Sequence, residues 1–150
     1  MRGRHLGNAA GPPRRKLPQA AAGINTMNEQ MNETIDFVRR VYRETDTMDV
    51  RRLSAYLTHD CTLCFANGAP LVGRAAIEHD LGGFMAMVDG MRHEIDDAWR
   101  IDDTILSRLQ VTYTRKDGVR KRYPAAIIWR MRGHRISRFE IYVDISTLFA

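Results

Sequence analysis

The chain has 150 residues, of which 44% are hydrophobic and 27% charged, proportions that are typical of a single globular domain. No apolar run approaches the roughly 20 residues that a membrane-spanning helix needs, so we expect no membrane partner. The net charge is +5, but the first 26 residues hold five basic and no acidic side chains, and the other 18 basic residues are balanced by 18 acidic ones. Because nucleic-acid-binding domains carry a basic surface on their folded part, this distribution argues against a nucleic-acid partner.

Residues 1–30 are predicted to form a disordered basic tail, followed by one α+β domain over residues 31–150. The tail is rich in glycine, proline and basic residues and poor in large apolar ones, a composition that cannot bury a core. An arginine-rich segment can also be a targeting peptide, but the uninterrupted apolar stretch of about 7–15 residues of a secretory signal is missing. We therefore expect a cytoplasmic protein whose tail extends upstream of a natural start at Met27 or Met31.

Apolar residues at helical spacing predict three helices, all of which precede the main run of strands. Asn32 or Thr34 can cap the first helix, and Asp49 can cap the second. The third helix is expected from about residue 74 to residue 87. A short strand, 61–65, and a turn-forming loop lie between the second helix and the third.

Four long strands with tight turns follow the helices. They are predicted over residues 91–101, 104–115, 119–132 and 135–144. Helices grouped on one side of an antiparallel sheet define an α+β architecture. Long strands that curl round one helix-covered face can enclose a cavity, so we expect a hydrophobic pocket inside.

The two cysteines, Cys61 and Cys64, form a C-x-x-C pair within the short predicted strand. Residues three apart on a strand face opposite sides, so the pair does not form a redox unit. The chain has no second cysteine pair to complete a zinc site, and its histidines lack metal-ligand spacing. We expect two packing thiols, no metal and no cofactor.

The strand over residues 91–101 carries the main chemical candidates. Alternation places His93 and Asp97 on one otherwise apolar face. A histidine with an inward carboxylate can act as a general acid or base near neutral pH, because its unperturbed pKa is about 6.5. In the next strand, alternation alone turns Val111 inward and Arg108 outward.

Short motifs in a defined order cover residues 34–148. They include Phe65-Ala66-Asn67-Gly68-Ala69-Pro70, Arg92-His93-Glu94-Ile95, Thr112-Tyr113-Thr114-Arg115-Lys116-Asp117-Gly118 and Tyr142-Val143-Asp144. In this order they resemble the SnoaL-like branch of the nuclear transport factor 2-like superfamily, which includes polyketide cyclases, ketosteroid isomerases, limonene epoxide hydrolases and non-catalytic binders. The resemblance implies a curved antiparallel sheet wrapped as a cone, an interior pocket for a small apolar molecule and a homodimer formed through the outer sheet face.

The acidic groups of two relatives have no counterpart in this sequence. Phe65 and Ile127 stand where the isomerase match expects its carboxylates. The arginine of the epoxide hydrolase matches Arg108, but Gln110 and Ile141 stand where its two carboxylates would be. This match implies that Arg108 and Gln110 face the pocket, and we adopt that facing over the one that alternation alone favours.

These arguments define a candidate site. Its catalytic residues are His93 as the proton carrier, with Asp97 and Arg108 orienting or polarising the substrate. The expected pocket lining is Phe65, Phe84, Ile95, Gln110, Tyr123, Ile127, Trp129, Phe139 and Ile141. Two functions remain open: a cofactor-independent isomerase, cyclase or hydrolase acting on a small apolar carbonyl compound, or a non-catalytic ligand-binding or dimerisation module.

Overall fold

The computed structural model describes residues 19–150, so the first 18 residues of the predicted tail lie outside the described part. The helices are α1 (Gln19–Thr45), α2 (Val50–Ser54) and α3 (Arg74–Ala86). The strands are β1 (Leu57–Phe65), β2 (Leu71–Val72), β3 (Val88–Ile101), β4 (Thr104–Arg115), β5 (Arg120–Arg132) and β6 (Arg135–Val143). None of the helices within residues 19–150 combines the length and the apolar content that crossing a bilayer requires.

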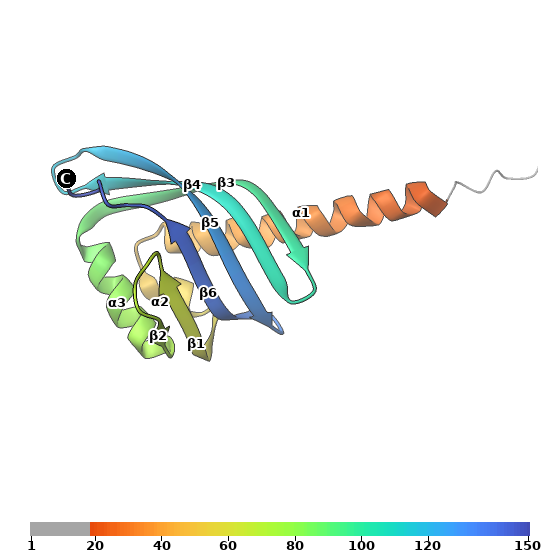
Figure 1. Ribbon diagram of the computed structural model, residues 1–150, viewed down its shortest axis with the longest axis horizontal. Coiled ribbons are helices and arrows are strands. Elements are labelled where there is room, and N and C mark those ends of the chain that lie inside the picture. Colours follow the sequence, from red (N-terminus) through yellow and green to blue (C-terminus); the bar gives the residue numbers. More distant parts are fainter. Residues whose placement is uncertain (1–18) are drawn as a thin grey trace, which may run out of the picture.

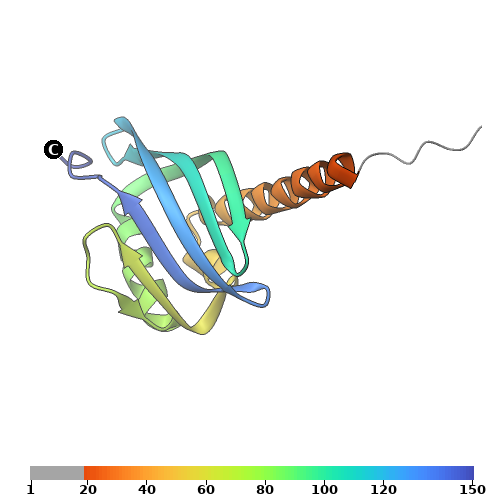
Figure 2. The same ribbon diagram turned by 45° about the vertical axis from the view of Figure 1, so that its right-hand side comes forward.

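One curved, open sheet holds all of these strands, in the order β2-β1-β6-β5-β4-β3. Strands β3 to β6 form the predicted antiparallel meander, and β1 runs parallel to β6. The helices lie on the concave side of the sheet (Figures 1 and 2), where α1 packs on β3 and α3 packs on β1. This is the α+β arrangement expected from the order of elements.

Helix α1 begins at Gln19, well before its predicted start. The first residues include three consecutive alanines, which have the highest helix propensity. The C-terminal half of the helix is buried through Val38, Val41 and Tyr42. Its N-terminal half projects past the edge of the sheet with exposed side chains (Figure 1). Residues 19–30 are therefore helical where the sequence analysis expected the end of a disordered tail.

The segment between α1 and α3 is more extended than predicted. Asp49 caps α2 as expected, since its Oδ1 accepts the backbone N–H of Arg51 at 3.0 Å. However, α2 ends at Ser54, and β1 already begins at Leu57 instead of Cys61. The longer strand buries more apolar surface where β1 pairs in parallel with β6, because Leu57 and Cys61 are both fully buried.

A β-bulge divides β3. Ile95 lies opposite Leu109, whereas Asp97 lies opposite Arg108, so two steps along β3 correspond to one step along β4. An extra residue on one strand reverses the facing of every side chain beyond it. Ala98 is consequently buried on the concave side, and its neighbours in β3 face outward.

Candidate functional site

A cavity of about 50 Å³ lies between the helices and the concave face of the sheet. Tyr42, Thr45, His93 and Tyr113 bring polar groups to its wall. The other lining residues are Leu53, Phe65, Leu81, Phe84, Met85, Met91, Leu109, Val111, Ala125, Ile127, Phe139, Ile141 and Val143. This wall contains no lysine or arginine, so it suits an uncharged and largely apolar molecule.

His93, in the middle of β3, is held by Asp46, the first residue after α1. Nδ1 of His93 lies 2.5 Å from Oδ1 of Asp46, and the backbone N–H of His93 donates to Oδ2 at 2.9 Å. Their side chains are 9% and 22% exposed, respectively. Because a carboxylate only accepts hydrogen bonds, Nδ1 carries the proton of the neutral imidazole and Nε2 is the basic nitrogen.

The end of α1 places the carboxylate of Asp46 next to β3. The backbone N–H of Asp46 donates to the carbonyl of Tyr42 at 2.8 Å, which continues the last helical turn. Tyr42 stacks on the ring of His93, with centroids 4.3 Å apart and planes inclined by 29°. The ring of Tyr42 also stacks on the buried ring of Trp129, with centroids 5.6 Å apart. Helix packing therefore fixes the orientation of the imidazole from two sides.

The tyrosine hydroxyls at this end of the cavity remain protonated. Burial, followed by the charges of Tyr113 and Asp46, raises the pKa of Tyr42 well above its ordinary value. Burial, followed by Tyr123 and Asp46, raises the pKa of Tyr113 as well. A phenol with a raised pKa meets a ligand as a neutral hydrogen-bonding group and not as an anion.

Two of the three predicted catalytic residues lie outside the cavity, which corrects the expected site. Asp97 and Arg108 lie on the convex face of the sheet, where Arg108 Nη2 and Asp97 Oδ2 form an ion pair at 2.6 Å. The side chains are 41% and 65% exposed, respectively. The bulge turns Asp97 outward, and β4 follows simple alternation, with Leu109 and Val111 inward and Arg108 outward.

Some of the expected lining residues contribute to the cavity wall, and others do not. Phe65, Phe84, Ile127, Phe139 and Ile141 contribute to the cavity wall, together with His93. Four other expected residues do not belong to it: Ile95, Gln110, Tyr123 and Trp129.

The reasons for these four differ. Gln110 faces outward with Arg108, because β4 follows simple alternation. Trp129 is fully buried behind Tyr42, so it supports the wall from the core. Tyr123 points toward the C-terminal segment, where its hydroxyl lies 3.0 Å from Oγ1 of Thr147. Ile95 packs against the core but does not reach the cavity.

Sequence reasoning missed Asp46 and Tyr42. Both continue the apolar stripe of α1, since Val38, Tyr42 and Asp46 are spaced four residues apart and share one helical face. A carboxylate in line with the buried face of a helix is uncommon, because an acidic side chain is rarely buried without a partner. That signal could have identified Asp46 as a candidate, but not its partner.

The arrangement is suited to proton transfer. A histidine with one nitrogen tied to a carboxylate can take up a proton at the other nitrogen, and the carboxylate stabilises the imidazolium that forms. No group of three or more His, Cys, Asp or Glu side chains that could hold a metal ion occurs within residues 19–150.

An open curved sheet with helices on its concave face defines the nuclear transport factor 2-like architecture. Residues 38–139, more than half of the chain, match the family model for the SnoaL-like domain. The chain therefore belongs to the SnoaL-like family, whose members include polyketide cyclases, isomerases and epoxide hydrolases. A comparison with curated proteins gave no match.

Solved structures with this fold are similar in shape and distant in sequence. A hypothetical protein with a ketosteroid isomerase-like fold from Catenulispora acidiphila, in complex with trimethylamine, is 23% identical, with 75% of this chain and 88% of that chain covered and a TM-score of 0.69. An NTF2-like protein of unknown function from Burkholderia pseudomallei is 17% identical, with 77% and 94% covered and a TM-score of 0.69. An LEH-like epoxide hydrolase from M. tuberculosis is 16% identical, with 79% and 88% covered and a TM-score of 0.66. At these identities the likeness establishes the fold alone.

Proposed function

We propose that this SnoaL-like protein is a cofactor-independent acid–base enzyme acting on a small, apolar, carbonyl-bearing molecule, with His93 as the proton carrier. The observation that carries the proposal is the His93–Asp46 pair in the wall of an otherwise apolar cavity. Asp97 was expected to orient or polarise the substrate, whereas Asp46 acts by orienting His93. Membership of a family that contains isomerases and cyclases supports the reaction class.

The proposed step needs no group from outside the chain. Nε2 of His93 removes a proton from the carbon next to the carbonyl, the C–H electron pair forms a new C=C bond, and the carbonyl π pair moves onto oxygen. An oxygen electron pair then re-forms the carbonyl while the C=C pair takes the proton from the imidazolium, at the same carbon or, in an unsaturated ketone, at the far end of the conjugated system, which regenerates the neutral ring. Asp46 stabilises the imidazolium between these two transfers.

Proton exchange tests this proposal without knowledge of the natural substrate. Cyclopentanone dissolved in deuterium oxide should exchange its α-protons faster with the protein than without it, and His93→Gln should reduce the rate to the protein-free level. We expect a loss of about 10²–10⁴-fold, the usual contribution of one general base. Exchange is measured by proton NMR. His79→Gln serves as the control, because His79 is exposed on α3.

Unchanged exchange in His93→Gln would contradict the assignment of His93. A second function, non-catalytic binding, is favoured by the small volume of the cavity, about 50 Å³, since ligand pockets usually measure about 300–1,000 Å³. A drug-sized ligand would require Met85 and Met91 to shift, which flexible methionine side chains allow. Cyclopentanone that binds without any exchange would support this second function.

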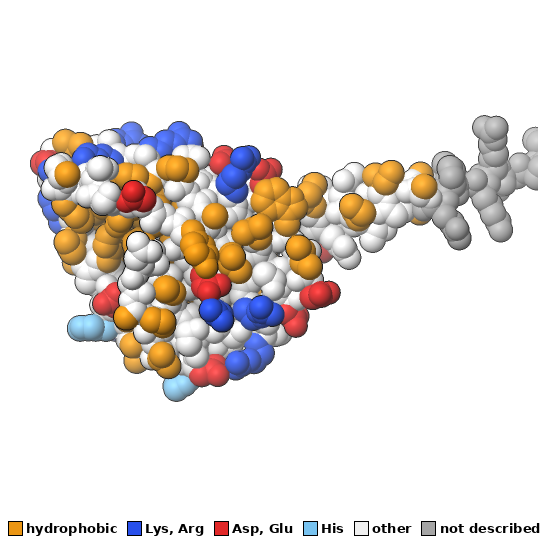
Figure 3. Space-filling view, viewed as in Figure 1, with side chains coloured by type: hydrophobic (Ala, Val, Ile, Leu, Met, Phe, Trp, Pro, Cys, Tyr) orange, Lys and Arg blue, Asp and Glu red, His pale blue; other side chains and the backbone are white. Residues whose placement is uncertain are grey.

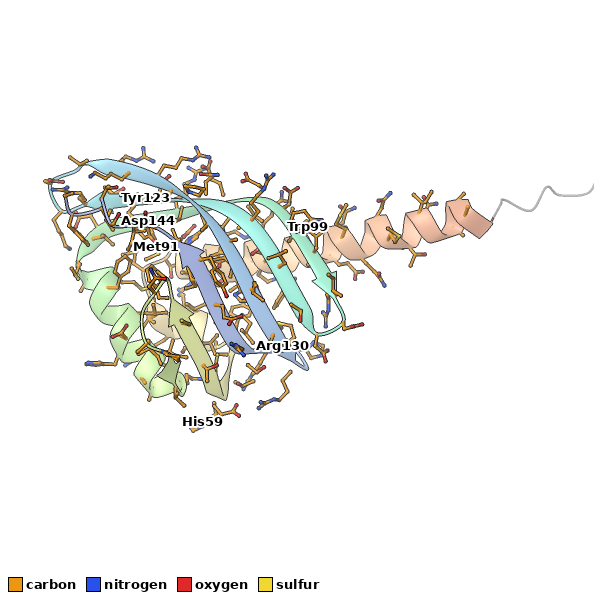
Figure 4. All side chains as sticks on the ribbon, viewed as in Figure 1. His59, Met91, Trp99, Tyr123, Arg130 and Asp144 are labelled. Carbon is orange, nitrogen blue, oxygen red and sulfur yellow. The ribbon has the colours of Figure 1, made fainter. Side chains whose placement is uncertain are left out.

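We also propose a homodimer formed through the convex face of the sheet. Trp99, Leu106 and Ile128 lie side by side there, since Leu106 is the register partner of both other residues. Trp99 is 40% and Leu106 38% exposed. Apolar side chains gather on this face and continue to the point where α1 leaves the domain, which is where Trp99 lies (Figures 3 and 4). Exposed apolar patches of this kind are typical of interfaces between proteins.

The dimer can be tested by a change of charge within this apolar band. Trp99→Glu should shift the full chain from twice the mass of one chain to a single chain, because a carboxylate cannot be buried unpaired at an interface. Light scattering coupled to size-exclusion chromatography measures the mass. Val72→Glu provides the control, since Val72 is an exposed apolar residue on β2 outside the band. A single-chain mass for the unaltered protein, or a dimer that survives Trp99→Glu, would contradict the proposed interface.

A cytoplasmic location is part of the same proposal. Cys61 and Cys64 are free thiols, as in most proteins of reducing compartments. Burial raises the pKa of Cys61 to about 11, so this thiol stays protonated and unreactive.

A further inference from the structure

The N-terminal part of α1 presents an apolar stripe that no other part of the described chain covers. Residues 20–33, the arm of this helix, project past the edge of the sheet (Figure 2), and nearly all of their side chains are exposed. Ile24, Met27 and Met31 are 59%, 69% and 45% exposed, respectively. Their spacing of three and four residues places them on one face of the helix. A helix normally packs such a face on a domain.

The stripe continues the buried face of α1. Val38 and Tyr42, which lie on the same helical face as Met31, are 0% and 4% exposed. They pack on the concave side of the sheet, where Tyr42 stacks on His93 of β3. The sheet of the described chain ends at β3, so the sheet-facing side of α1 has nothing to pack on in the arm. There this side points in the same direction as the convex face of the sheet.

The charges of the arm are complementary to those of the convex face. The arm contains two acidic side chains, Glu29 and Glu33, and no basic one. The exposed side chains of β5 include four arginines and no acid: Arg120, Arg122, Arg130 and Arg132. Charges attract each other over a Debye length of about 10 Å, roughly the diameter of a helix. Helical spacing places both glutamates opposite the stripe, so neither is buried when the stripe packs on a sheet.

We propose that the arm of each chain lies across the convex face of a second copy of the chain, with Ile24, Met27 and Met31 on the apolar band of that copy. The inference rests on the proposed homodimer and identifies a segment that completes its interface. In a twofold dimer the same patch is used by both chains, so both arms are covered at once. Trp99 and Leu106 of the second copy then meet apolar side chains instead of water.

The dimensions of the arm suit this arrangement. At 1.5 Å per residue the arm is about 20 Å long, whereas four strands spaced by about 4.8 Å span roughly 14 Å of sheet. A stable interface buries about 800 Å² of each partner, of which Trp99 and Leu106, at 40% and 38% exposure, supply a small part. The more exposed side chains of the arm add apolar area that the convex face by itself lacks.

A charge within the stripe tests the contact. Met27→Glu should raise the dissociation constant of the full-chain dimer at least about tenfold, because a carboxylate is costly to bury without a partner. Thr26→Glu is the matched control, since it adds the same charge at the next position, on the polar side of the helix, and should leave the constant nearly unchanged. Sedimentation equilibrium measures both constants. Both positions are exposed in the single chain, so both variants should fold.

A spin label identifies the surface that the arm contacts. Glu29→Cys combined with Cys64→Ser leaves one accessible thiol, on the polar side of the arm, because Cys61 is fully buried. Spin-labelled chains are mixed with isotope-labelled chains that carry no spin label, so broadened amide signals report contacts between copies. We expect broadening around Leu106 in β4, and Met27→Glu in the spin-labelled chain should abolish it.

The outcomes separate this inference from the proposed dimer. A single-chain mass of the unaltered protein overturns both. A dimer that Met27→Glu does not weaken, or that shows no broadening between copies, overturns the contact of the arm and leaves the dimer through the convex face in place. Broadening confined to residues 20–33 shows that the two arms pair with each other, which overturns their placement on the sheet.

Discussion

Replacing Trp129 with alanine is expected to lower the free energy of unfolding by about 3–5 kcal/mol, the range observed when large aromatic residues are removed from a core. Trp129 is fully buried and contacts three aromatic rings, those of Phe37, Tyr42 and Phe139, at centroid distances of 6.0, 5.6 and 5.5 Å. These contacts join α1 to β5 and β6. Since domains of this size are stable by only about 5–15 kcal/mol, the loss is a large share of the total. Urea unfolding followed by far-ultraviolet circular dichroism measures it.

Two control variants define the origin of this loss. Trp129→Phe keeps an aromatic ring and removes the unsatisfied Nε1–H, so it should cost much less than Trp129→Ala. Trp99→Ala should change the unfolding free energy of the single chain little, because Trp99 is 40% exposed on the convex face. A Trp129→Ala protein as stable as Trp99→Ala would show that α1 does not depend on the aromatic contacts.

The inner face of the meander could be predicted from alternation because β4 and β5 are regular. Leu109 and Val111 in β4, and Ile127 in β5, are all buried as the two-residue period requires. Arg108 follows the same pattern and faces outward, so the inward facing implied by the match to the epoxide hydrolase is wrong. A long charged side chain on a sheet is far more stable in water than in an apolar cavity without a partner.

The facing of the second half of β3 could not be predicted from the sequence. A bulge depends on hydrogen bonding between strands and has no strict residue requirement. Nothing in Glu94-Ile95-Asp96-Asp97 indicates that one residue is unpaired. Strict alternation from His93 would place Trp99 inside, whereas the structure exposes it on the convex face.

The partner of His93 was beyond sequence reasoning for a different reason. His93 and Asp46 are 47 residues apart, and their contact depends on how α1 crosses β3. Alternation and helical spacing locate residues on faces of one element, but they do not determine the angle between two elements. The sequence motifs thus identify one half of a tertiary pair, and only packing identifies the other half.

The substitution Asp46→Asn is expected to reduce the rate of proton exchange by about 10²–10⁴-fold while leaving ligand binding and folding nearly unchanged. An asparagine oxygen can still accept the backbone N–H of His93, while the amide nitrogen would face Nδ1. A donor at that position requires Nδ1 to accept, which moves the ring proton to Nε2. The nitrogen that faces the ligand would then have no free electron pair with which to remove a proton. The exchange of cyclopentanone α-protons, compared with its NMR-measured affinity, separates the two effects.

The control is Asp97→Asn, which removes a carboxylate from the convex face of the sheet, where the Asp97 side chain is 41% exposed against 22% for Asp46. Asp97 pairs with Arg108 on the convex face, so its loss should leave exchange unchanged and should cost little stability, as is usual for exposed ion pairs. Equal losses of exchange in the two variants would point to a general effect of charge and not to the tautomer of His93. Exchange that depends on Asp97 alone would contradict the pairing of the proton carrier, His93, with Asp46 and would place the chemistry on the convex face of the sheet.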